Sequence, residues 1–369
     1  MIKSNFFVLI GCGGVAWLFA RSDAQRACYS YRVFATLARA YLALLAFYLF
    51  LRITVGDGFW GVSLLNTFAP FWFVPLPLAL TFLGWKRWWP SFALASGLSL
   101  VALFWFGGGF LPKPVPVAAG PTFKVVNFNM RASPEGLEPW LREVQPDLVL
   151  LQEVPQAYPA QALESLNDLY PFQQGQAELY KGNLVLSRYP VSSSAELSTL
   201  GDYVTQRLVV EVAGTPVAVY NVHLSWPIGS RRLPRDFTPG ALRLLTSFDD
   251  RRRNAEVAQL AQNLADEPLP FVAAGDFNLS QHAVTYGVLA KVAKDAHREI
   301  GRGFGNTWRL RPNLPLPLRI DYLWHSAGLT PVRMEHGPTF ASDHVPLVTE
   351  LSLNVQDWRV RGGPCQLFE

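Results

Sequence analysis

The chain has 369 residues, of which 50% are hydrophobic and 16% are charged, and its formal net charge is +4. Residues 1–120 contain nine basic and two acidic residues, a net charge of +7, whereas the remainder contains 23 basic and 26 acidic residues, a net charge of −3. The C-terminal part therefore has no overall positive field of the kind that attracts nucleic acids. The three cysteines, Cys12, Cys28 and Cys365, are too dispersed to imply a disulfide framework.

The first third of the chain has the composition of a membrane region. Three stretches lack charged residues, namely 4–20, 58–85 and 88–112. The last two exceed the ~20 residues that a spanning helix needs. A further apolar stretch, 40–51, spans only if the arginines at its two ends reach the two interfaces. We expect three or four transmembrane helices, with a kink in the third segment at Pro70, Pro75 and Pro77. The alternative is a buried helical domain of a soluble protein.

The basic residues between these segments predict the orientation in the membrane. The connections 21–34 and 86–90 contain Lys or Arg, whereas the connection 53–59 contains neither. Because cytoplasmic connections are enriched in Lys and Arg, residues 53–59 are expected outside and the last helix runs outward. The same orientation follows whether or not residues 4–20 span. The sequence thus predicts a multi-pass protein of the cell membrane whose C-terminal domain lies outside the cytoplasm.

Two local features bear on the domain boundaries. The sequence LIGC at 9–12 matches a bacterial lipoprotein cleavage box, but the apolar run continues past it, which favours a membrane segment. The stretch 107–123 is rich in glycine and proline and predicts an extended linker. We expect a transmembrane region and linker over 1–118, a folded domain over 119–355 and a C-terminal tail over 356–369.

From residue 122 onward, predicted strands alternate with predicted helices. Helices are expected near 136–144, 157–168 and 252–265, and a short Gly-Thr-Pro turn at 214–216 indicates a β-hairpin. Strands are expected at FKVVNFNM, DLVLLQEV, GNLVLSRYPV, QRLVVEVAG, TPVAVYNVHL, PFVAAGDFN, RIDYLWH and VPLVTEL. Hairpins together with helical connections favour two packed sheets flanked by helices, an α/β fold.

Polar residues at the ends of these strands are the main indication of function. Each has a structural explanation by itself, such as a turn cap, an ion pair or a hydrogen-bonded core histidine. The same explanation for the whole set is much weaker, because nearly all its members are acceptors or imidazoles. Carboxylates with amide oxygens suit a hard cation such as Mg²⁺, and histidines suit a phosphate oxygen or a proton transfer. The set comprises Asn129, Glu153, His223, Asp276, Asn278, Asp321, Asp343 and His344.

The ordered motifs over about 122–352 resemble the endonuclease/exonuclease/phosphatase superfamily. They are VVNFNM, PDLVLLQEV, GNLVLSRYPV, YNVHL, GDFN, RIDYLW and SDHVPL. That group includes pancreatic-type deoxyribonucleases, abasic-site endonucleases, neutral sphingomyelinases and inositol polyphosphate 5-phosphatases. The resemblance implies a four-layered αββα sandwich and a metal-dependent hydrolase of phosphoric esters, so that 119–355 is the catalytic domain.

The resemblance also implies a metal site. Glu153 corresponds to the principal Mg²⁺ ligand, with Asn129 and Asp343 near the metal, and Mn²⁺ is the alternative ion. One position departs from the abasic-site endonucleases, because Arg131 stands where they place a metal-binding aspartate. This departure weakens a DNA-repair function and leaves open whether one or two metal ions bind.

The catalytic residues follow from the same resemblance. Asp276 is expected to orient or deprotonate the attacking water, and Asn278 to hold the phosphate. His223 and His344 are expected to contact non-bridging oxygens, with Asp321 as the carboxylate partner of His344. A carboxylate behind an imidazole fixes its tautomer and favours its charged form.

The substrate has to be inferred from other features. The long segment 225–253 follows His223 and contains Arg231, Arg232 and Arg235 among apolar residues, so it is either a solvated loop or a rim that binds anionic lipid headgroups. The overall layout resembles bacterial membrane-anchored members of the superfamily, such as a teicoplanin-resistance membrane phosphatase.

We therefore expect a membrane-anchored Mg²⁺-dependent phosphohydrolase that acts on a lipid-linked or headgroup phosphate ester. The alternative is a membrane-tethered endo- or exonuclease that acts on external nucleic acid. A catalytically silent binding domain is a third class, against which the complete polar set argues. No obligate protein partner is inferred.

Overall fold

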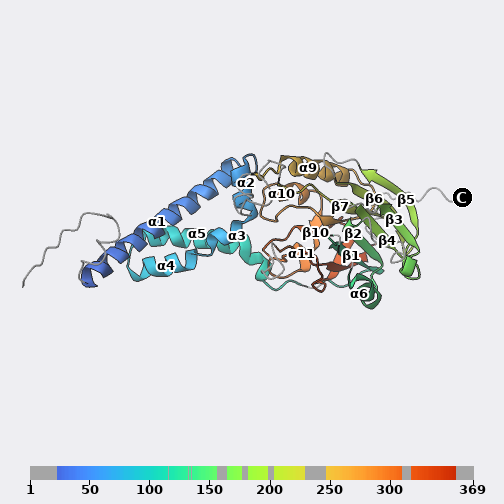
Figure 1. Ribbon diagram of the computed structural model, residues 1–369, viewed down its shortest axis with the longest axis horizontal. Helices are drawn as coiled ribbons and strands as arrows, with labels where there is room; N and C mark the ends of the chain where they lie inside the picture. The colour runs from blue at the N-terminus through green and yellow to red at the C-terminus, as the bar shows by residue number, and fades with distance from the viewer. Residues whose placement is uncertain are drawn as a thin grey trace, which may run out of the picture. The chain divides into compact units, whose positions relative to one another are not determined.

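The fold is given by a computed structural model (Figure 1). The structure describes residues 23–114, 116–131, 133, 135–155, 164–176, 182–197, 203–228, 247–309 and 317–354. Two compact units are present, the first of Met1–Phe50 and Trp72–Ala102 and the second of Leu51–Phe71 and Leu103–Glu369. The domain boundaries expected after residues 118 and 355 stay a prediction.

The first unit consists of apolar helices. Its main elements are α1 (Asp23–Thr54), α4 (Leu76–Trp85) and α5 (Trp89–Phe106), of which α1 and α5 continue into the second unit. Large apolar side chains are exposed on these helices, as expected for helices that face lipid. They include Leu37, Leu44, Phe47, Leu78 and Leu100.

Two or three candidate membrane spans occur within the described residues. Tyr31–Thr54 and Trp89–Phe110 are both long and apolar enough to cross a membrane. The short helix α2 (Trp60–Thr67) and the run Ala69–Trp85, which includes α3 (Ala69–Phe73), form a third candidate that is bent by 76°. The break precedes Pro70, in agreement with the predicted kink. The predicted segment 4–20 lies outside the described residues.

The second unit is built on two six-stranded sheets (Figure 1). The first sheet has the order β11-β12-β1-β2-β4-β3 and the second the order β5-β6-β7-β8-β10-β9. The strands of the first sheet are β1 (Thr122–Asn129), β2 (Leu148–Val154), β3 (Phe172–Gln176), β4 (Gly182–Ser187), β11 (Leu329–His336) and β12 (Leu347–Leu353). Those of the second are β5 (Val191–Leu197), β6 (Thr205–Val212), β7 (Thr215–His223), β8 (Phe271–Asp276), β9 (Lys294–Asp295) and β10 (Asp321–His325).

Helices cover the outer faces of the sheets. On the first sheet lies α6 (Leu137–Val144), and on the second lie α9 (Arg251–Ala265) and α10 (Tyr286–Leu289). The buried residues of α9 recur at helical spacing, so one face of the helix packs on the sheet. The unit also contains α2 and two other short helices, η1 (Gly107–Phe110) and α11 (Ala296–Ile300). The predicted helix near 157–168 lies largely outside the described residues.

Three apolar cores separate the layers. The central core lies between the sheets and includes Val125 and Leu150 of the first sheet and Val219 and Val272 of the second. The outer cores lie beneath α6 on one side and beneath α9 and α10 on the other. The order helix, sheet, sheet, helix confirms the predicted four-layered α/β sandwich. Side chains that point inward from the ends of the strands are therefore brought together between the two sheets.

Candidate active site

Three of the candidate residues lie side by side at the ends of adjacent strands in the second sheet. His223 ends β7, Asp276 ends β8 and Asp321 begins β10, and Asp276 is in register with both of the others. Ala274 and Val272, two and four residues before Asp276, belong to the core between the sheets. Because strand side chains alternate, Asp276 points to the same inward face.

A glycine makes the close approach of β7 and β8 possible. Gly275 has φ +153°, and a Cβ atom added there would lie 1.8 Å from the carbonyl oxygen of Val222. Only a residue without a side chain fits between the strands at this point. The motif GDFN therefore places Asp276 directly beside His223.

Glu153 reaches the site through an irregularity in β2. By alternation its side chain would point to the outer face, where Val149 and Leu151 pack under α6. Instead, the register shifts between Leu151 and Val154, and Glu153 has φ +51°. Such a bulge redirects a side chain, and strained backbone of this kind is common at functional sites.

Asn129 joins the carboxylates of the two sheets. Its Nδ2 donates hydrogen bonds to Glu153 Oε1 at 3.1 Å and to Asp276 Oδ2 at 3.0 Å. One amide therefore bridges a carboxylate of β2 and a carboxylate of β8. This bridge holds the two carboxyl groups close together, one fully buried and one half-buried.

A second set of amides connects the sheets beneath Asn129. The Nε2 of Gln152 donates to Asn127 Oδ1 at 2.9 Å and to Asn221 Oδ1 at 2.7 Å. All three side chains are buried. Buried polar networks of this kind hold a specific arrangement because leaving a member unpaired is costly. The network therefore helps to fix the distance between the two sheets at the strand ends where the site lies.

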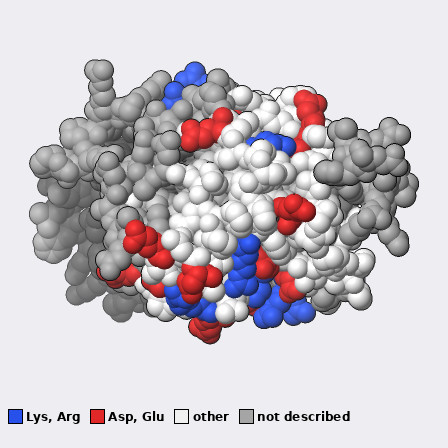
Figure 2. Space-filling view, turned by 90° about the vertical axis from the view of Figure 1, so that its right-hand side faces the viewer, with Lys and Arg blue, Asp and Glu red and all other residues white. Residues whose placement is uncertain are grey.

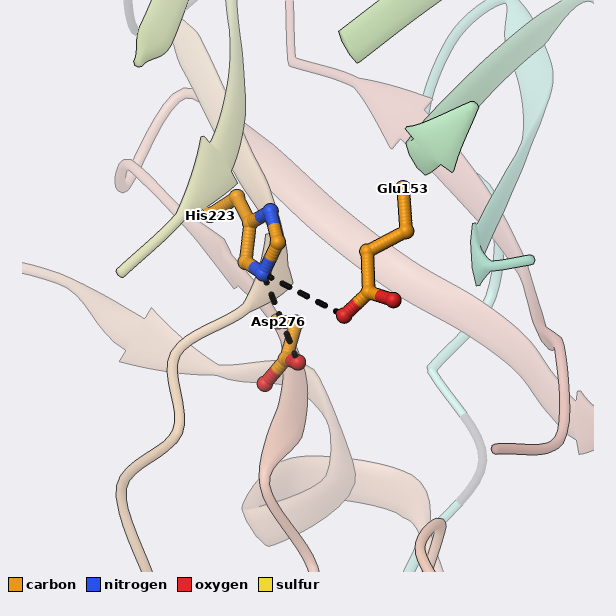
Figure 3. A group of neighbouring side chains, drawn as sticks. All are labelled: Glu153, His223 and Asp276. Atoms are coloured by element: carbon orange, nitrogen blue, oxygen red, sulfur yellow. Dashed lines mark ion pairs between the residues drawn. The ribbon is translucent and has the colours of Figure 1, made fainter. Parts of the chain in front are cut away.

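Both histidines converge on Asp276. The Nε2 of His223 lies 3.8 Å from Glu153 Oε1 and 4.0 Å from Asp276 Oδ2 (Figure 3). The Nδ1 of His344 lies 2.9 Å from Asp321 Oδ2, and its Nε2 lies 3.7 Å from Asp276 Oδ2. The expected pairing of Asp321 with His344 is present, which directs Nε2 of His344 toward the centre of the site.

The remaining two candidates occupy different positions. Asn278 donates from its backbone nitrogen to Asp276 Oδ1 at 2.8 Å and from Nδ2 to Asp276 Oδ2 at 3.3 Å. Asp343 is held at the margin, where its Oδ2 accepts from Trp308 Nε1 at 3.1 Å and lies 3.0 Å from a guanidinium nitrogen of Arg131. In this structure Asp343 is therefore paired with a cation.

Burial governs the electrostatics of the site. Burial raises the pKa of Asp276 to about 8, because the nearby His344 cation offsets it only in part, and burial also raises the pKa of Glu153. Burial and the His344 cation lower the pKa of His223 to about 3. For His344, burial acts to lower the pKa, but Asp321 and Asp276 outweigh it and raise the pKa to about 10. At neutral pH one imidazole is therefore neutral and the other is charged.

The residues present fit a divalent cation. Two groups of side chains each offer ligand atoms within 4.8 Å of one another, namely Glu153 with His223 and Asp276, and Asp276 with Asp321 and His344. A protonated imidazole has no lone pair to donate, so the neighbourhood of Glu153 in the first group is the better place for the ion. The raised pKa values of its carboxylates show that their negative charge is poorly compensated, and a cation would supply that compensation.

Some features of the site are not evident from the sequence pattern. The ring of Tyr203 packs against that of His223 with centroids 4.0 Å apart and the ring planes tilted by 37°, and Trp308 contacts Asp343. Both residues come from irregular segments, where no periodicity or motif indicates a role. The proposed headgroup-binding residues Arg231, Arg232 and Arg235 lie outside the described residues.

Comparisons with known proteins agree with this architecture. A model of the Endonuclease/Exonuclease/phosphatase family matches residues 126–344. No curated protein gives a match.

Among solved structures, TDP2 of D. rerio, humanized by 14 mutations, is 19% identical with a TM-score of 0.50, covering 63% of this chain and 99% of its own. An endonuclease/exonuclease/phosphatase from Beutenbergia cavernae is 21% identical with a TM-score of 0.48, covering 63% of this chain and 72% of its own. The catalytic domain of human Nocturnin with bound sulfate is 19% identical with a TM-score of 0.45, covering 64% of this chain and 96% of its own.

Proposed function

Because the chain belongs to the endonuclease/exonuclease/phosphatase family, it is a hydrolase of phosphate esters, and we propose that it is membrane-anchored and Mg²⁺-dependent and acts on a lipid-linked or headgroup phosphate. The family covers several substrates, so the substrate has to be argued from this chain alone. The resemblance to membrane phosphatases of the teicoplanin-resistance type stays a prediction.

The main support for the proposal is the position of the ends of the candidate spans, which lie in the second unit beside the loop that follows β8. A guanidinium nitrogen of Arg52 donates to the carbonyl oxygen of His282 at 2.6 Å, and Arg52 also covers the ring of Trp105 at 4.2 Å. The rings of Trp105 and Phe106 pack edge-on against His282. Both span ends, near Thr54 and Phe110, therefore adjoin the loop that follows β8.

This loop leads directly to the active site. His282 is six residues after Asp276, and six residues reach at most about 20 Å. If the spans cross a bilayer, their ends mark its surface, and the active site lies within that distance of it. A phosphate in a lipid headgroup would then lie within about 20 Å of the catalytic residues.

Apolar side chains near this loop suit a membrane surface. Val284 is 43% exposed and adjoins Gly56, and the aromatic residues Phe59 and Trp60 are 51% and 44% exposed. Aromatic residues are enriched where a membrane meets water. On the face drawn in Figure 2, by contrast, the described acidic and basic side chains are interspersed around a large uncharged centre. That face offers no continuous basic area among the described residues for a nucleic acid.

The contacts of Asp57 bear on the topology. Its Oδ2 accepts hydrogen bonds from the backbone nitrogen and the hydroxyl of Thr285, at 2.7 and 2.8 Å. Asp57 and the active-site loop therefore lie on one side of the membrane, and an even number of crossings separates them. The absence of Lys and Arg from residues 53–59 supports the outer side for both.

The geometry supports a division of roles at the metal. We propose Glu153 as the principal Mg²⁺ ligand, with Asn129 and Asp343 near the ion. Bound Mg²⁺ would neutralise charge on the phosphate oxygens. The hydrogen bond from Asn129 fixes the orientation of the Glu153 carboxylate, which would hold the ion.

The remaining residues act on the water and the phosphate. With the ion bound, Asp276 would accept the proton of the attacking water, and Asn278 would hold the phosphate. The charged His344 donates from Nε2 to a non-bridging oxygen, because its Nδ1 is bound to Asp321. The neutral His223 would donate its single N–H to another non-bridging oxygen.

A substrate screen tests the proposal. The full chain in mixed detergent micelles with Mg²⁺ is assayed for phosphate or headgroup release from phosphatidic acid, polyprenyl phosphates, sphingomyelin, bis(p-nitrophenyl) phosphate and DNA. We expect a lipid to be the best substrate, with a rate that falls as the lipid is diluted within the micelle surface at constant bulk concentration.

Controls identify the source of the activity. Glu153→Ala removes the proposed ligand and should abolish turnover, whereas Glu335→Ala, at an exposed glutamate of β11, should not affect it. DNA as the best substrate, with no dependence on micelle composition, would replace the lipid phosphohydrolase with a tethered nuclease.

A further inference from the structure

The loop after β8, residues 277–285, is held by contacts on two sides. On one side it contacts α2, a helix from the apolar N-terminal part of the chain. Ser63 in α2 is fully buried, and its hydroxyl donates a short hydrogen bond to the carboxylate of Asp250. The hydroxyl of Ser280, in the loop, donates to the carbonyl oxygen of Thr67 at 3.1 Å. The first part of the predicted third membrane segment is therefore part of the second unit.

Asp250 is connected through Arg253 to the candidate catalytic residue Asn278. A guanidinium nitrogen of Arg253 lies 2.9 Å from Asp250 Oδ2, and a second one donates to the carbonyl oxygen of Asn278 at 2.8 Å. Asp250 and Arg253 are each 1% exposed. A buried ion pair needs its remaining hydrogen-bond groups satisfied, and Ser63 and Asn254 supply two of these bonds to Asp250.

Asn278 needs such support because of its backbone conformation. It has φ +48°, a left-handed conformation that is unusual for a residue with a side chain. In this conformation its backbone nitrogen donates to Asp276, and its side chain donates to the carbonyl oxygen of Leu224 at 2.9 Å. Relaxation of this backbone would turn Asn278 away from Asp276. Arg253 binds the carbonyl oxygen of Asn278 and so holds the peptide group that follows this residue.

The helix α9, which contains Arg253, also holds the loop after β7. The carboxylate of Glu256 accepts hydrogen bonds from the backbone nitrogen and hydroxyl of Ser225, at 2.8 and 2.7 Å. Ser225 is two residues after His223. The first turns of α9 thus hold both loops that follow catalytic strands, and Ser63 connects this part of α9 to α2.

We propose that Ser63, Asp250 and Arg253 are positioning residues that couple the docking of α2 to the conformation of Asn278. Docked α2 orients Asp250, Asp250 orients the guanidinium of Arg253, and Arg253 holds the carbonyl of Asn278. Turnover then depends on a helix that belongs to the membrane-proximal part of the chain. None of the three residues needs to touch the substrate.

The test uses the full chain in detergent with Mg²⁺ and the soluble diester bis(p-nitrophenyl) phosphate. Ser63→Ala removes one hydrogen bond and should lower kcat about fivefold with little change in KM, since loop geometry rather than substrate binding is altered. Arg253→Lys keeps the charge but loses the planar fork that reaches two acceptors, and kcat should fall about thirtyfold. Thr81→Ala, which removes a hydroxyl bond within α4, is the matched control and should retain full activity.

The double variant separates coupling from general destabilisation. Because the two residues act through one chain of contacts, Ser63→Ala should add almost nothing to Arg253→Lys. Two effects that multiply would overturn the proposal, as would an unchanged kcat in Ser63→Ala. Should Ser63→Ala not yield folded protein, Ser63→Cys, which keeps the side-chain volume and weakens the hydrogen bond, replaces it with the same expectation.

Amide hydrogen exchange gives a readout that does not depend on the substrate. In Ser63→Ala, exchange of residues 277–285 should accelerate while the β-strand amides stay protected. This result would support the positioning role even if the phosphohydrolase proposal failed. Unchanged exchange in this loop would refute the role even if the enzyme is active on lipids.

Discussion

Replacing Asp321 by asparagine is the sharpest test of the electrostatic argument. Asp321 is buried, and its Oδ2 lies 2.9 Å from Nδ1 of His344. Asp321→Asn keeps nearly the same shape and removes the negative charge. The imidazolium of His344 then loses its main stabilising partner, although Asp276 still lies 3.7 Å away from Nε2.

The size of the effect follows from the geometry. A hydrogen bond to a charged group contributes about 1.5–3 kcal/mol. At about 1.36 kcal/mol per pKa unit, its loss lowers the pKa of His344 by about one to two units. At a pH above both pKa values, the protonated fraction of His344 and with it kcat/KM falls by about ten- to 150-fold. At pH 7 the lowered pKa still keeps His344 charged, so the rate there changes little.

The pH dependence of the rate separates this explanation from simple misfolding. In the wild type, Asp321 and Asp276 keep His344 protonated to high pH, so activity is lost only as pH rises through the raised pKa. In Asp321→Asn that basic limb should move to lower pH by one to two units. The assay is kcat/KM for bis(p-nitrophenyl) phosphate between pH 6 and 10, with folding checked by circular dichroism. Asp266→Asn, at an exposed residue after α9, is the matched control. A basic limb that does not move, with a rate lowered equally at every pH, would refute the charge argument.

Four further predictions concern the metal, the base, the topology and the rim. Glu153→Ala should abolish activity and Mg²⁺ binding, measured by calorimetry; full activity at ordinary Mg²⁺ concentration would exclude Glu153 as the principal ligand. Asp276→Asn should leave Mg²⁺ affinity largely intact and lower kcat by orders of magnitude, whereas equal losses of affinity and rate would make Asp276 a metal ligand itself. A reporter fused after residue 120 should be active only outside the cytoplasm, and activity only inside would reverse the topology. Changing the three arginines of the proposed headgroup-binding segment to serine should weaken turnover of substrate in anionic bilayers, and less so at high salt. Turnover of a short-chain soluble substrate should stay the same, whereas a loss of DNA binding would instead indicate a nucleic-acid groove. These arginines are Arg231, Arg232 and Arg235.

Much of the site could be predicted from the sequence because it depends on local order along the chain. A buried run that ends in a polar residue identifies a strand end, and alternation correctly places Asn129, His223 and Asp276 on the inward face. The motif order over 122–352 then predicted the sandwich that the structure shows.

Tertiary structure alone decided two other features. Alternation would turn Glu153 outward, and only the register shift in β2, which depends on its pairing with β4, brings the carboxylate to Asn129. Hydropathy assigned residues 58–85 to one membrane segment because it averages over neighbours in sequence. The hydroxyl of Ser63 is bound by Asp250, 187 residues away, and a contact over that separation leaves no trace in a local average. Composition and periodicity therefore determined which residues are available, while the pairing of distant strands and the docking of α2 determined how they face one another.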